Sequence, residues 1–570
     1  MKQSGENHMV KRRGNGRKVV VVGLDGATFA LIKPWAREGK LPHLGRVLRQ
    51  GAHGALQSTI PPVTPPAWIS SATGVNPGKH NIYGFFKPMR HRYSRTPYNA
   101  SDVKAKKIWQ ILHAYGKRSG ILHLPLTYPV DRFNGFMVAG IMTPDEATDF
   151  THPPELLDEL RRVIPDYRLN ISLNSWKAGL LDEFYEESVR ILHIQREETL
   201  YLMDHKPWDL FWVMFHHVDG VMHVYWKFME ERHPYYPGET RFKNAILDYY
   251  RQLDDLLGEI LRRLDENTDL VILSDHGHEM IRKHVFLLNW LRDRGWLAVN
   301  ERRASPLERA FRMVGLQRER LIKRLERWHL GWLPKLFPEA LKNQVPRGVV
   351  TFKNIERRID WTRTRAFMPS ASAMAIWLNV RGREPQGVVE PGQHYRALRE
   401  ELIEQLRTFR DDETGEPILE AIYTPEEIYV GDYAGEAPDL LLLTRPGYYI
   451  HEGFGPRTLV YAGRRANERS GHHHMQGILL LYGQHIRRGV ELRGARIIDV
   501  TPTILYMMGL PVQSYMDGHA LTEAFEPTYV ARHPVETDDI VAGEPPPQTM
   551  AYSPEEEQLV IERLKDMGYM

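Results

Sequence analysis

The sequence predicts an α/β fold with a mostly parallel central sheet and helices on both of its faces. Its first apolar segment, Lys18–Val22, is a run of valines, which is typical of a strand buried on both sides. Segments with helical periodicity, such as Lys107–Tyr115 and Leu247–Leu264, separate the later apolar runs. Strands that alternate with helices in this way form a covered parallel sheet. Further strands are expected at Gly120–Leu124, Leu210–Phe215, Leu270–Leu273 and Gly477–Tyr482.

The length and the charge balance narrow the class of protein. A chain of 570 residues is expected to hold two to four domains, or one large α/β domain with insertions. Lys and Arg number 75 against 72 Asp and Glu, so nucleic acid is not favoured as the main partner. The longest apolar run, Leu210–Phe215, is too short to span a bilayer. The N-terminal residues lack the apolar core of a secretory signal, and we therefore expect a cytoplasmic protein.

The absence of cysteine limits the available chemistry. With no Cys in the sequence, disulfides and thiolate nucleophiles are excluded. Any catalytic metal ion must therefore bind to His and carboxylate side chains.

Composition changes along the chain predict five parts. They are a disordered basic arm (1–17), the first part of a catalytic α/β core (18–290), a helical basic insertion (291–350), the second part of the core (351–525), and a Pro-containing linker with a C-terminal helix (526–570). In the insertion, Arg302–Lys335 is either a helical segment with a solvated basic face or a surface for a peripheral anionic partner. In the last part, Ser553 and Glu556 predict a capping box around Pro554 at the first helical position.

Four segments place side chains suited to metal binding at the ends of predicted strands. Each segment alone is weak evidence, because isolated Asp–His pairs are usually surface or capping features and a His triplet is usually a solvated loop. In Asp219 and His223, the i,i+4 spacing would put both side chains on one face of a helix. Together, three Asp and three His suit two divalent ions such as Zn²⁺ or Mn²⁺. The candidates are Asp25, Asp219, His223, Asp275, His276 and one member of the triplet His472, His473 and His474.

Thr64 is the candidate nucleophile of this site. Two adjacent metal ions favour phosphoryl or sulfuryl transfer, in which a hydroxyl can receive the transferred group. Prolines on both sides stiffen the backbone at Thr64, and Pro65 should bias this residue away from the α conformation. We therefore expect the hydroxyl just before a short helix at Ala67–Ala72, close to the N–H donors of its first turn.

A set of motifs in a fixed order connects these residues to a known family. The motifs are Val22–Gly26, Thr64–Trp68, Thr73–Tyr83, Asp219–His223, Ser274–Gly277 and Gly471–Gly477. In these segments, from about Lys18 to about Ala524, the sequence resembles the alkaline phosphatase superfamily, in particular the type I phosphodiesterase/nucleotide pyrophosphatase family. The resemblance implies an alkaline-phosphatase-like three-layer sandwich with a helical or cap insertion. It also implies a two-metal hydrolase of phosphodiester or pyrophosphate bonds.

The resemblance also implies a role for each candidate residue. One ion would be held by Asp25, Thr64, Asp275 and His276, and the other by Asp219, His223 and His473. His473 is preferred within the triplet because the family's late histidine follows a glycine plus one residue. Thr64 would form a phospho-threonine intermediate that water then hydrolyses. Zn²⁺ is the expected ion, with Mn²⁺ as the second choice, and the expected substrate is a small phosphate ester or nucleotide-like molecule.

Two alternatives use the same fold. One is a metal-dependent phosphomutase of the cofactor-independent phosphoglycerate mutase type, although those enzymes use Ser where this chain has Thr64. The other is a non-catalytic binding protein, which has no physical reason to keep every charged ligand in a buried cleft. A sulfatase is disfavoured, because the sequence after Thr64 lacks the Cys/Ser-x-Pro-x-Arg context that those enzymes require.

Overall fold

The computed structural model describes residues 15–90, 93, 95–170, 179–300, 358–369, 374–451, 453–462, 468–539 and 552–566. The basic segment Arg302–Lys335 and residues 1–14 of the expected arm lie outside the described residues. Arg17, at the end of that arm, is buried, and its Nε donates to Asp269 Oδ2 at 2.8 Å. The core of the protein therefore begins before Lys18.

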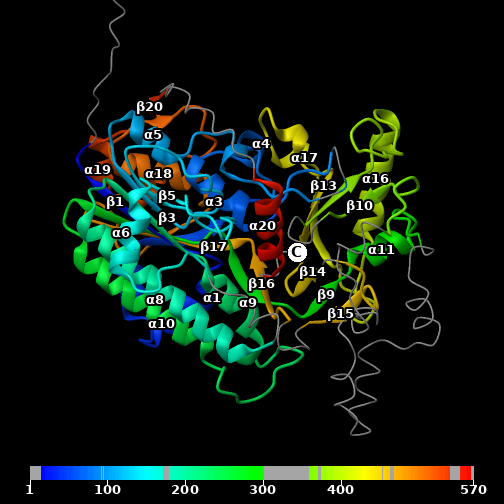
Figure 1. Ribbon diagram of the computed structural model, residues 1–570, viewed down its shortest axis with the longest axis horizontal. Helices are drawn as coiled ribbons and strands as arrows, with labels where there is room; N and C mark the ends of the chain where they lie inside the picture. The colour runs from blue at the N-terminus through cyan, green and yellow to red at the C-terminus, as the bar shows by residue number, and fades with distance from the viewer. Residues whose placement is uncertain are drawn as a thin grey trace, which may run out of the picture.

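A nine-stranded, mostly parallel sheet forms the centre of the larger lobe (Figure 1). From one edge to the other its strands are β18 (Val490–Leu492), β2 (Ala52–Gln57), β17 (Gln476–Tyr482), β7 (Thr268–Leu273), β1 (Lys18–Leu24), β6 (Leu210–Phe215), β3 (Ser119–Leu122), β4 (Gly135–Val138) and β5 (Thr151–His152). β1 lies between β6 and β7 and is parallel to both, whereas β17 runs antiparallel to β2 and β7. All the strands that the sequence predicted are present, although the one expected at Gly120–Leu124 ends at Leu122.

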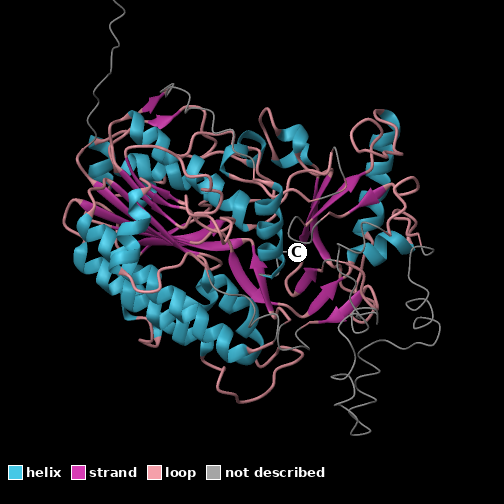
Figure 2. Cartoon of the chain, viewed as in Figure 1, coloured by secondary structure: helices cyan, strands magenta, loops and turns pink. Residues whose placement is uncertain are grey.

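Helices cover both faces of this sheet, which gives the predicted three layers (Figure 2). Alternate side chains of β1 enter different cores: Val20 and Val22 pack in one cluster, and Val19 and Val21 in the other. The first cluster includes residues of α1 (Phe29–Arg37), α2 (Pro42–Gln50), α6 (Glu155–Val163), α8 (Leu181–His205), α9 (His217–Met229) and α10 (Ala245–Arg263). The second includes residues of α3 (Thr64–Thr73), α5 (Ile108–Ala114) and α18 (Val500–Met507).

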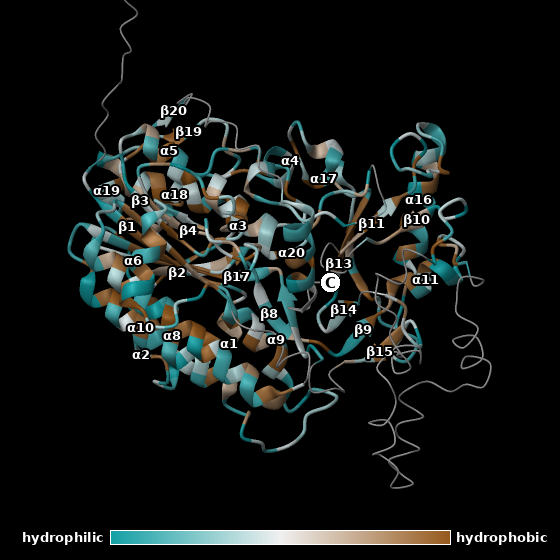
Figure 3. Ribbon diagram, viewed as in Figure 1, coloured by the Kyte–Doolittle hydropathy of each residue, from teal (hydrophilic) through white to brown (hydrophobic). Residues whose placement is uncertain are grey.

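A second, smaller lobe is built around two more sheets. One has the order β10 (Ala366–Phe367), β11 (Ala375–Leu378), β13 (Leu440–Thr444) and β12 (Leu419–Tyr423), and the other the order β14 (Tyr448–Ile450), β9 (Lys283–Val285) and β15 (Leu459–Tyr461). Helices α11 (Leu287–Asp293) and α16 (Gln393–Arg407) pack on them around a separate hydrophobic core (Figure 3). Trp296 and Leu297, which we assigned to the basic insertion, are buried in this core.

The C-terminal helix α20 (Pro554–Asp566) is docked on the larger lobe. The predicted capping box is confirmed, with Ser553 N donating to Glu556 Oε2 at 2.8 Å and Glu556 N to Ser553 Oγ at 3.1 Å. Val560 and Leu564 are fully buried in the first core cluster. The preceding segment is not wholly a linker, because α19 (Pro527–Arg532) is followed by β20 (Thr537–Asp538), which pairs with β19 (Val512–Gln513).

Two short helices, α4 (Pro77–His80) and α17 (Pro425–Ile428), complete the main elements. Among the described residues, no helix combines the length and the apolar character needed to cross a bilayer.

Candidate metal centre

The candidate site lies at the carboxyl ends of three adjacent strands of the central sheet. Asp25 directly follows β1, α9 with Asp219 follows β6, and Asp275 and His276 follow β7. The carboxyl ends of parallel strands are where open α/β sheets bind ligands. The strand order β7-β1-β6 thus brings three sequence-distant segments to one place.

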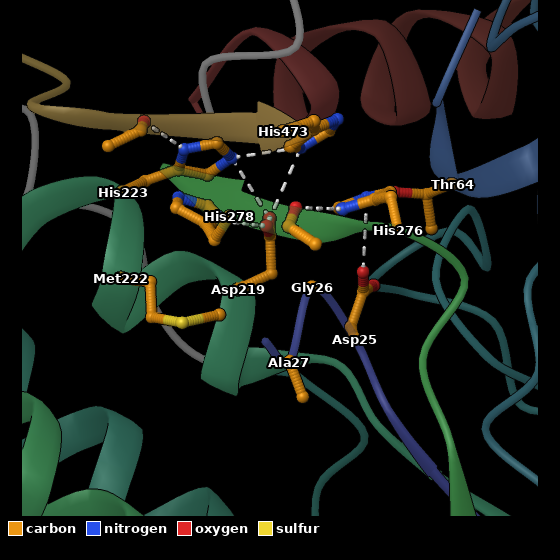
Figure 4. A network of polar contacts seen from close by, with 12 residues as sticks. Asp25, Gly26, Ala27, Thr64, Asp219, Met222, His223, His276, His278 and His473 are labelled. Carbon is orange, nitrogen blue, oxygen red and sulfur yellow. Dashed lines mark hydrogen bonds and ion pairs between the residues drawn. The ribbon is translucent and has the colours of Figure 1, made fainter. Parts of the chain in front are cut away.

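Asp219, His223 and His473 converge on one point (Figure 4). His223 Nε2 lies 3.0 Å from Asp219 Oδ2, as the i,i+4 spacing on α9 predicts. His473 Nε2 lies 3.2 Å from His223 Nε2 and 3.5 Å from Asp219 Oδ1. All three side chains are buried, so these atoms surround a small polar pocket inside the protein.

The remaining predicted residues form a second pocket beside the first. His276 Nε2 lies 3.2 Å from Asp275 Oδ2, 3.5 Å from Asp25 Oδ1 and 3.4 Å from the hydroxyl oxygen of Thr64. These four residues are fully buried. The structure thus brings together all seven residues that the sequence analysis singled out.

The three imidazoles share one orientation. Nδ1 of His223, His473 and His276 donates to the backbone carbonyls of Gly471, Pro62 and Gly277, at 2.7, 3.0 and 3.1 Å respectively. A carbonyl can only accept, so each Nδ1 carries the ring proton and each Nε2 presents a lone pair to the pockets. Backbone carbonyls commonly fix metal-ligating histidines in this way.

The three buried carboxyl groups of the site have strongly shifted pKa values. Burial, followed by the charge of Asp219, raises the pKa of Asp25 well above its usual range. Burial, followed by the charge of Asp25, does the same for Asp275. Although burial alone would raise it, His223 and His473 hold the pKa of Asp219 well below its usual range. Buried carboxylates this close together need a positive partner, and divalent ions fit the donor set.

Thr64 differs from its prediction in one respect. The helix α3 begins at Thr64 itself and not at Ala67, because Pro65 and Pro66 occupy its first turn. Prolines are tolerated in the first turn of a helix, because the N–H group that they lack would have no intrahelical acceptor there. Val63 is the extended N-cap residue. The Thr64 hydroxyl consequently stands at the positive end of the helix dipole.

The histidine triplet is not a solvated loop. It lies in β16 (Gly471–His474), which pairs antiparallel with β8 (Gly277–Met280). His473 is the member whose Nε2 contacts Asp219 and His223. His474 is half-buried, and its Nδ1 accepts from the backbone N–H of Gln476 at 3.2 Å.

Two further histidines, which the sequence analysis did not select, contact the site. His216 Nδ1 lies 2.6 Å from Asp25 Oδ2, and His278 Nδ1 lies 3.3 Å from Asp219 Oδ1. His216 directly follows the predicted strand Leu210–Phe215, and His278 follows His276 by two residues. These positions after predicted strands are the signal in the sequence that could have identified both histidines.

Comparison with known proteins gives a family match and a similar solved structure. Residues 19–476 match the family described as type I phosphodiesterase / nucleotide pyrophosphatase. The fold is similar to that of phosphonoacetate hydrolase from Sinorhizobium meliloti 1021 in complex with phosphonoformate, with a TM-score of 0.50 and 15% identity over 87% of this chain and 97% of that chain. Murine ectonucleotide pyrophosphatase / phosphodiesterase 5 in complex with AMP has a TM-score of 0.47 and 14% identity, covering 90% of this chain and 100% of that chain. The sequence matches none of the curated proteins.

The family match spans most of the chain and contains every residue of the candidate site, and the fold is alkaline-phosphatase-like. The chain therefore belongs to the type I phosphodiesterase/nucleotide pyrophosphatase family of the alkaline phosphatase superfamily, and it is a phosphodiesterase- or pyrophosphatase-like hydrolase.

Proposed function

We propose that the chain is a two-metal hydrolase of phosphodiester or pyrophosphate bonds that acts through a phospho-threonine at Thr64. The observation that carries this proposal is the convergence of Nε2 lone pairs and buried carboxylates in two adjacent pockets beside the Thr64 hydroxyl. Four groups of three His or Asp residues have ligand atoms within 4.8 Å of one another in this region. The preferred substrate is a small phosphate ester or a nucleotide-like molecule.

The residues fit two divalent ions. Asp25, Thr64, Asp275 and His276 would hold one ion, and Asp219, His223 and His473 would hold the other. When bound, such ions supply the positive charge that favours ionisation of a hydroxyl and neutralises the phosphate oxygens. A mixed imidazole and carboxylate donor set suits Zn²⁺ best and Mn²⁺ next.

The protein groups have separate roles in the proposed reaction. Thr64 Oγ1 loses its proton and attacks phosphorus, the bond from phosphorus to the leaving-group oxygen breaks, and that oxygen takes up a proton. The phosphoryl group, with the remaining substituent of a diester, is then bound to Thr64. Attack by water on the same phosphorus afterwards breaks the bond to Oγ1 and regenerates the hydroxyl. The N-terminus of α3 favours negative charge on the transferred group through the helix dipole, although Pro65 and Pro66 in its first turn have no N–H to donate. His216 holds Asp25 in place through its 2.6 Å contact.

Metal analysis combined with two model substrates tests this function. We expect two divalent ions per chain and faster hydrolysis of bis-p-nitrophenyl phosphate than of p-nitrophenyl phosphate. Asp219→Asn should reduce both metal content and hydrolysis, because it removes a buried charge that faces the pocket. Asp248→Asn is the matched control, since the Asp248 side chain is 49% exposed on α10. A protein that retains no metal after dialysis against Zn²⁺ or Mn²⁺, or a loaded protein that cleaves neither substrate, contradicts the proposal.

A further inference from the structure

A groove lined by cationic side chains lies at the edge of the central sheet that β18 forms. Its lining residues come from α1, α2, β2 and the chain at β18, and its volume is about 440 Å³. Small-molecule sites typically have volumes of about 300–1,000 Å³, so the groove is large enough for a small organic ligand. We call it the basic groove and define it by the ionisable side chains that line it, which are Lys33, Arg37, Arg49, His53 and Glu491.

The basic groove is separate from the candidate metal centre. Leu480 of β17 pairs with both His53 of β2 and Ile272 of β7, so His53 lies two strands away from β7. Neighbouring strands are about 4.8 Å apart, which makes this offset about 10 Å. Asp275 lies three residues beyond Ile272, which adds about 10 Å along the strand. A ligand in the groove would therefore occupy a different site from a substrate at the metal centre.

Positive charge exceeds negative charge in the basic groove. Lys33 Nζ lies 3.4 Å from Glu491 Oε1, and the Glu491 side chain is 59% exposed. Among the residues that the structure describes, neither Arg37 nor Arg49 has an ion-pair partner. Burial, followed by the charge of Lys33, lowers the pKa of His53, so this ring is neutral at neutral pH. Three cations thus line the groove with one carboxylate, and both guanidinium groups are available to a ligand.

The groove also has apolar surface between its charges. Ala36 of α1 and Leu48 of α2 line it with apolar side chains, whereas Gly45 of α2 has none. A Cβ atom at position 45 would lie 3.2 Å from Arg49 Nη1 and 3.5 Å from Ala36 Cβ. Glycine is unfavourable inside a helix, but here its small size leaves space between the two helices. The lining therefore suits a ligand that is anionic at one end and apolar at the other.

We propose that the basic groove binds a small organic phosphate, with the phosphate held by Arg37 and Arg49 and the organic part against Ala36 and Leu48. Guanidinium groups form paired, charge-assisted hydrogen bonds with phosphate oxygens, and Lys33 adds further positive charge. Among the described residues, the groups of His and Asp that could hold a metal ion include no residue of the groove. The groove thus holds its ligand without cleaving it. This inference goes beyond the proposed hydrolase function and does not depend on it.

Isothermal titration of the full chain in EDTA tests the site. Without divalent ions the metal centre should not cleave the probe, which is phenyl phosphate. We expect one phenyl phosphate per chain, bound about tenfold more tightly than inorganic phosphate, because the ring buries apolar surface. Benzyl alcohol, which lacks the charge, should not bind detectably. The affinity for phenyl phosphate should decrease as the ionic strength rises, because salt screens the exposed cations.

Four substitutions assign the binding to the basic groove. Arg37→Gln and Arg49→Gln should each weaken phenyl phosphate binding by about tenfold, because each removes a charged hydrogen-bond donor. Gly45→Leu should abolish binding, since its side chain would fill the space between α1 and α2. Glu491→Gln should strengthen binding several-fold, because it removes the one carboxylate of the groove. A gain of affinity cannot result from a damaged fold.

Arg46→Gln is the matched control. Arg46 lies on the same helix as Arg49, but its exposed side chain points to Gln50 and Tyr482, with hydrogen bonds of 3.3 and 2.9 Å. This variant loses the same charge outside the groove, so it should bind phenyl phosphate like the wild type. Equal unfolding midpoints of all the variants would show that the changes in affinity are local.

Several results would overturn the proposal. Wild-type affinity in both the Arg37 and the Arg49 variants would remove the phosphate site. An equal loss in Arg46→Gln would show only a general attraction of anions to a basic surface. Equal affinities for phenyl phosphate and inorganic phosphate would remove the organic part of the ligand. None of these results would affect the proposed hydrolase function, because all of them are measured without metal ions or turnover.

Discussion

His223 and His473 point their Nε2 atoms at each other across 3.2 Å, while both use Nδ1 to bond a backbone carbonyl. In the neutral tautomers that these carbonyls select, neither Nε2 carries a proton, so no hydrogen bond joins the two rings. Two lone pairs at this separation repel each other unless a cation lies between them. A divalent cation bound by both rings would remove this repulsion, so metal binding should stabilise the folded protein.

Removal of metal should lower stability as well as activity. A ligand present at a hundred times its dissociation constant stabilises the folded state by about 2.7 kcal/mol, so chelation should lower Tm by several degrees. Zn²⁺ or Mn²⁺ should restore both Tm and hydrolysis better than Ca²⁺, because three of the seven proposed donors are imidazoles and Ca²⁺ prefers oxygen ligands. Differential scanning fluorimetry with EDTA provides the measurement, and zinc-saturated EDTA is the control. Unchanged Tm and full turnover in EDTA would rule out a resident metal.

The proposed nucleophile can be tested by a three-member series at Thr64. Thr64→Ala should reduce turnover to near background, because no oxygen remains to attack phosphorus. Thr64→Ser should retain part of the activity, since only the methyl group that restricts the rotamer is lost. Phosphorylation of residue 64, found by mass spectrometry after an acid quench, should occur with Thr and Ser but not with Ala. Wild-type turnover in the Ala variant would favour direct attack by water.

His216 should act on metal affinity without being a ligand. Its Nδ1 lies 2.6 Å from Asp25 Oδ2, so it fixes the direction in which the other carboxylate oxygen faces. Loss of such a partner typically weakens metal binding by about ten- to a hundredfold. We expect that loss for His216→Ala in chelator-competition titrations. His217→Ala, which changes the neighbouring ring, should bind metal like the wild type, and equal losses in both variants would reduce His216 to a packing role.

His80 should make the protein acid-sensitive. Burial lowers the pKa of His80 to about 3, compared with about 6.5 in the unfolded chain. As the pH falls below about 6.5, the unfolded chain binds a proton that the folded one does not, so stability decreases towards pH 3. Between pH 6.5 and 5 the wild type should thus lose about 1.6 kcal/mol more unfolding free energy than His80→Gln, because the unfolded histidine takes up a proton over this range. Urea titrations measure this difference, with the exposed His193→Gln as control. Parallel slopes for wild type and His80→Gln would contradict it.

The docked C-terminal helix should contribute to global stability. Leu564 is fully buried in the first core cluster, so Leu564→Ala should cost about 2–5 kcal/mol of unfolding free energy. Gln558→Ala changes an exposed position of the same helix and should have little effect. Chemical denaturation of both variants measures the two costs. A loss below about 0.5 kcal/mol for Leu564→Ala would mean that α20 is only loosely attached.

Local patterns predicted the central strands and the Asp219–His223 pair, because both depend on side chains a few residues apart. The contacts that complete the site could not be read in this way. The Nδ1 atom of His473 bonds the carbonyl of Pro62, 411 residues away, and no local signal announces that contact. The strand that carries His472–His474 exists through its pairing with β8, and composition alone favoured a loop. Likewise, the burial of Leu564 depends on the helices that it contacts, so the sequence predicted a C-terminal helix after a linker but not its docking.

The position of β2 in the sheet also affects how the protein is made. β2 is synthesised early, but its two neighbours, β17 and β18, come from residues 476–482 and 490–492. Until those residues are synthesised, β2 cannot form its native pairs, and unpaired strand edges are prone to aggregation. Its sequence, Ala-His-Gly-Ala-Leu-Gln, is suited to that wait, because Leu56 is its only large aliphatic residue. β16 with His473 immediately precedes β17, so the candidate metal centre and the partner of β2 both depend on the same late segment of the chain. A chain that ends before β16 would thus lack both His473 and a partner strand of β2, and we expect it to be inactive.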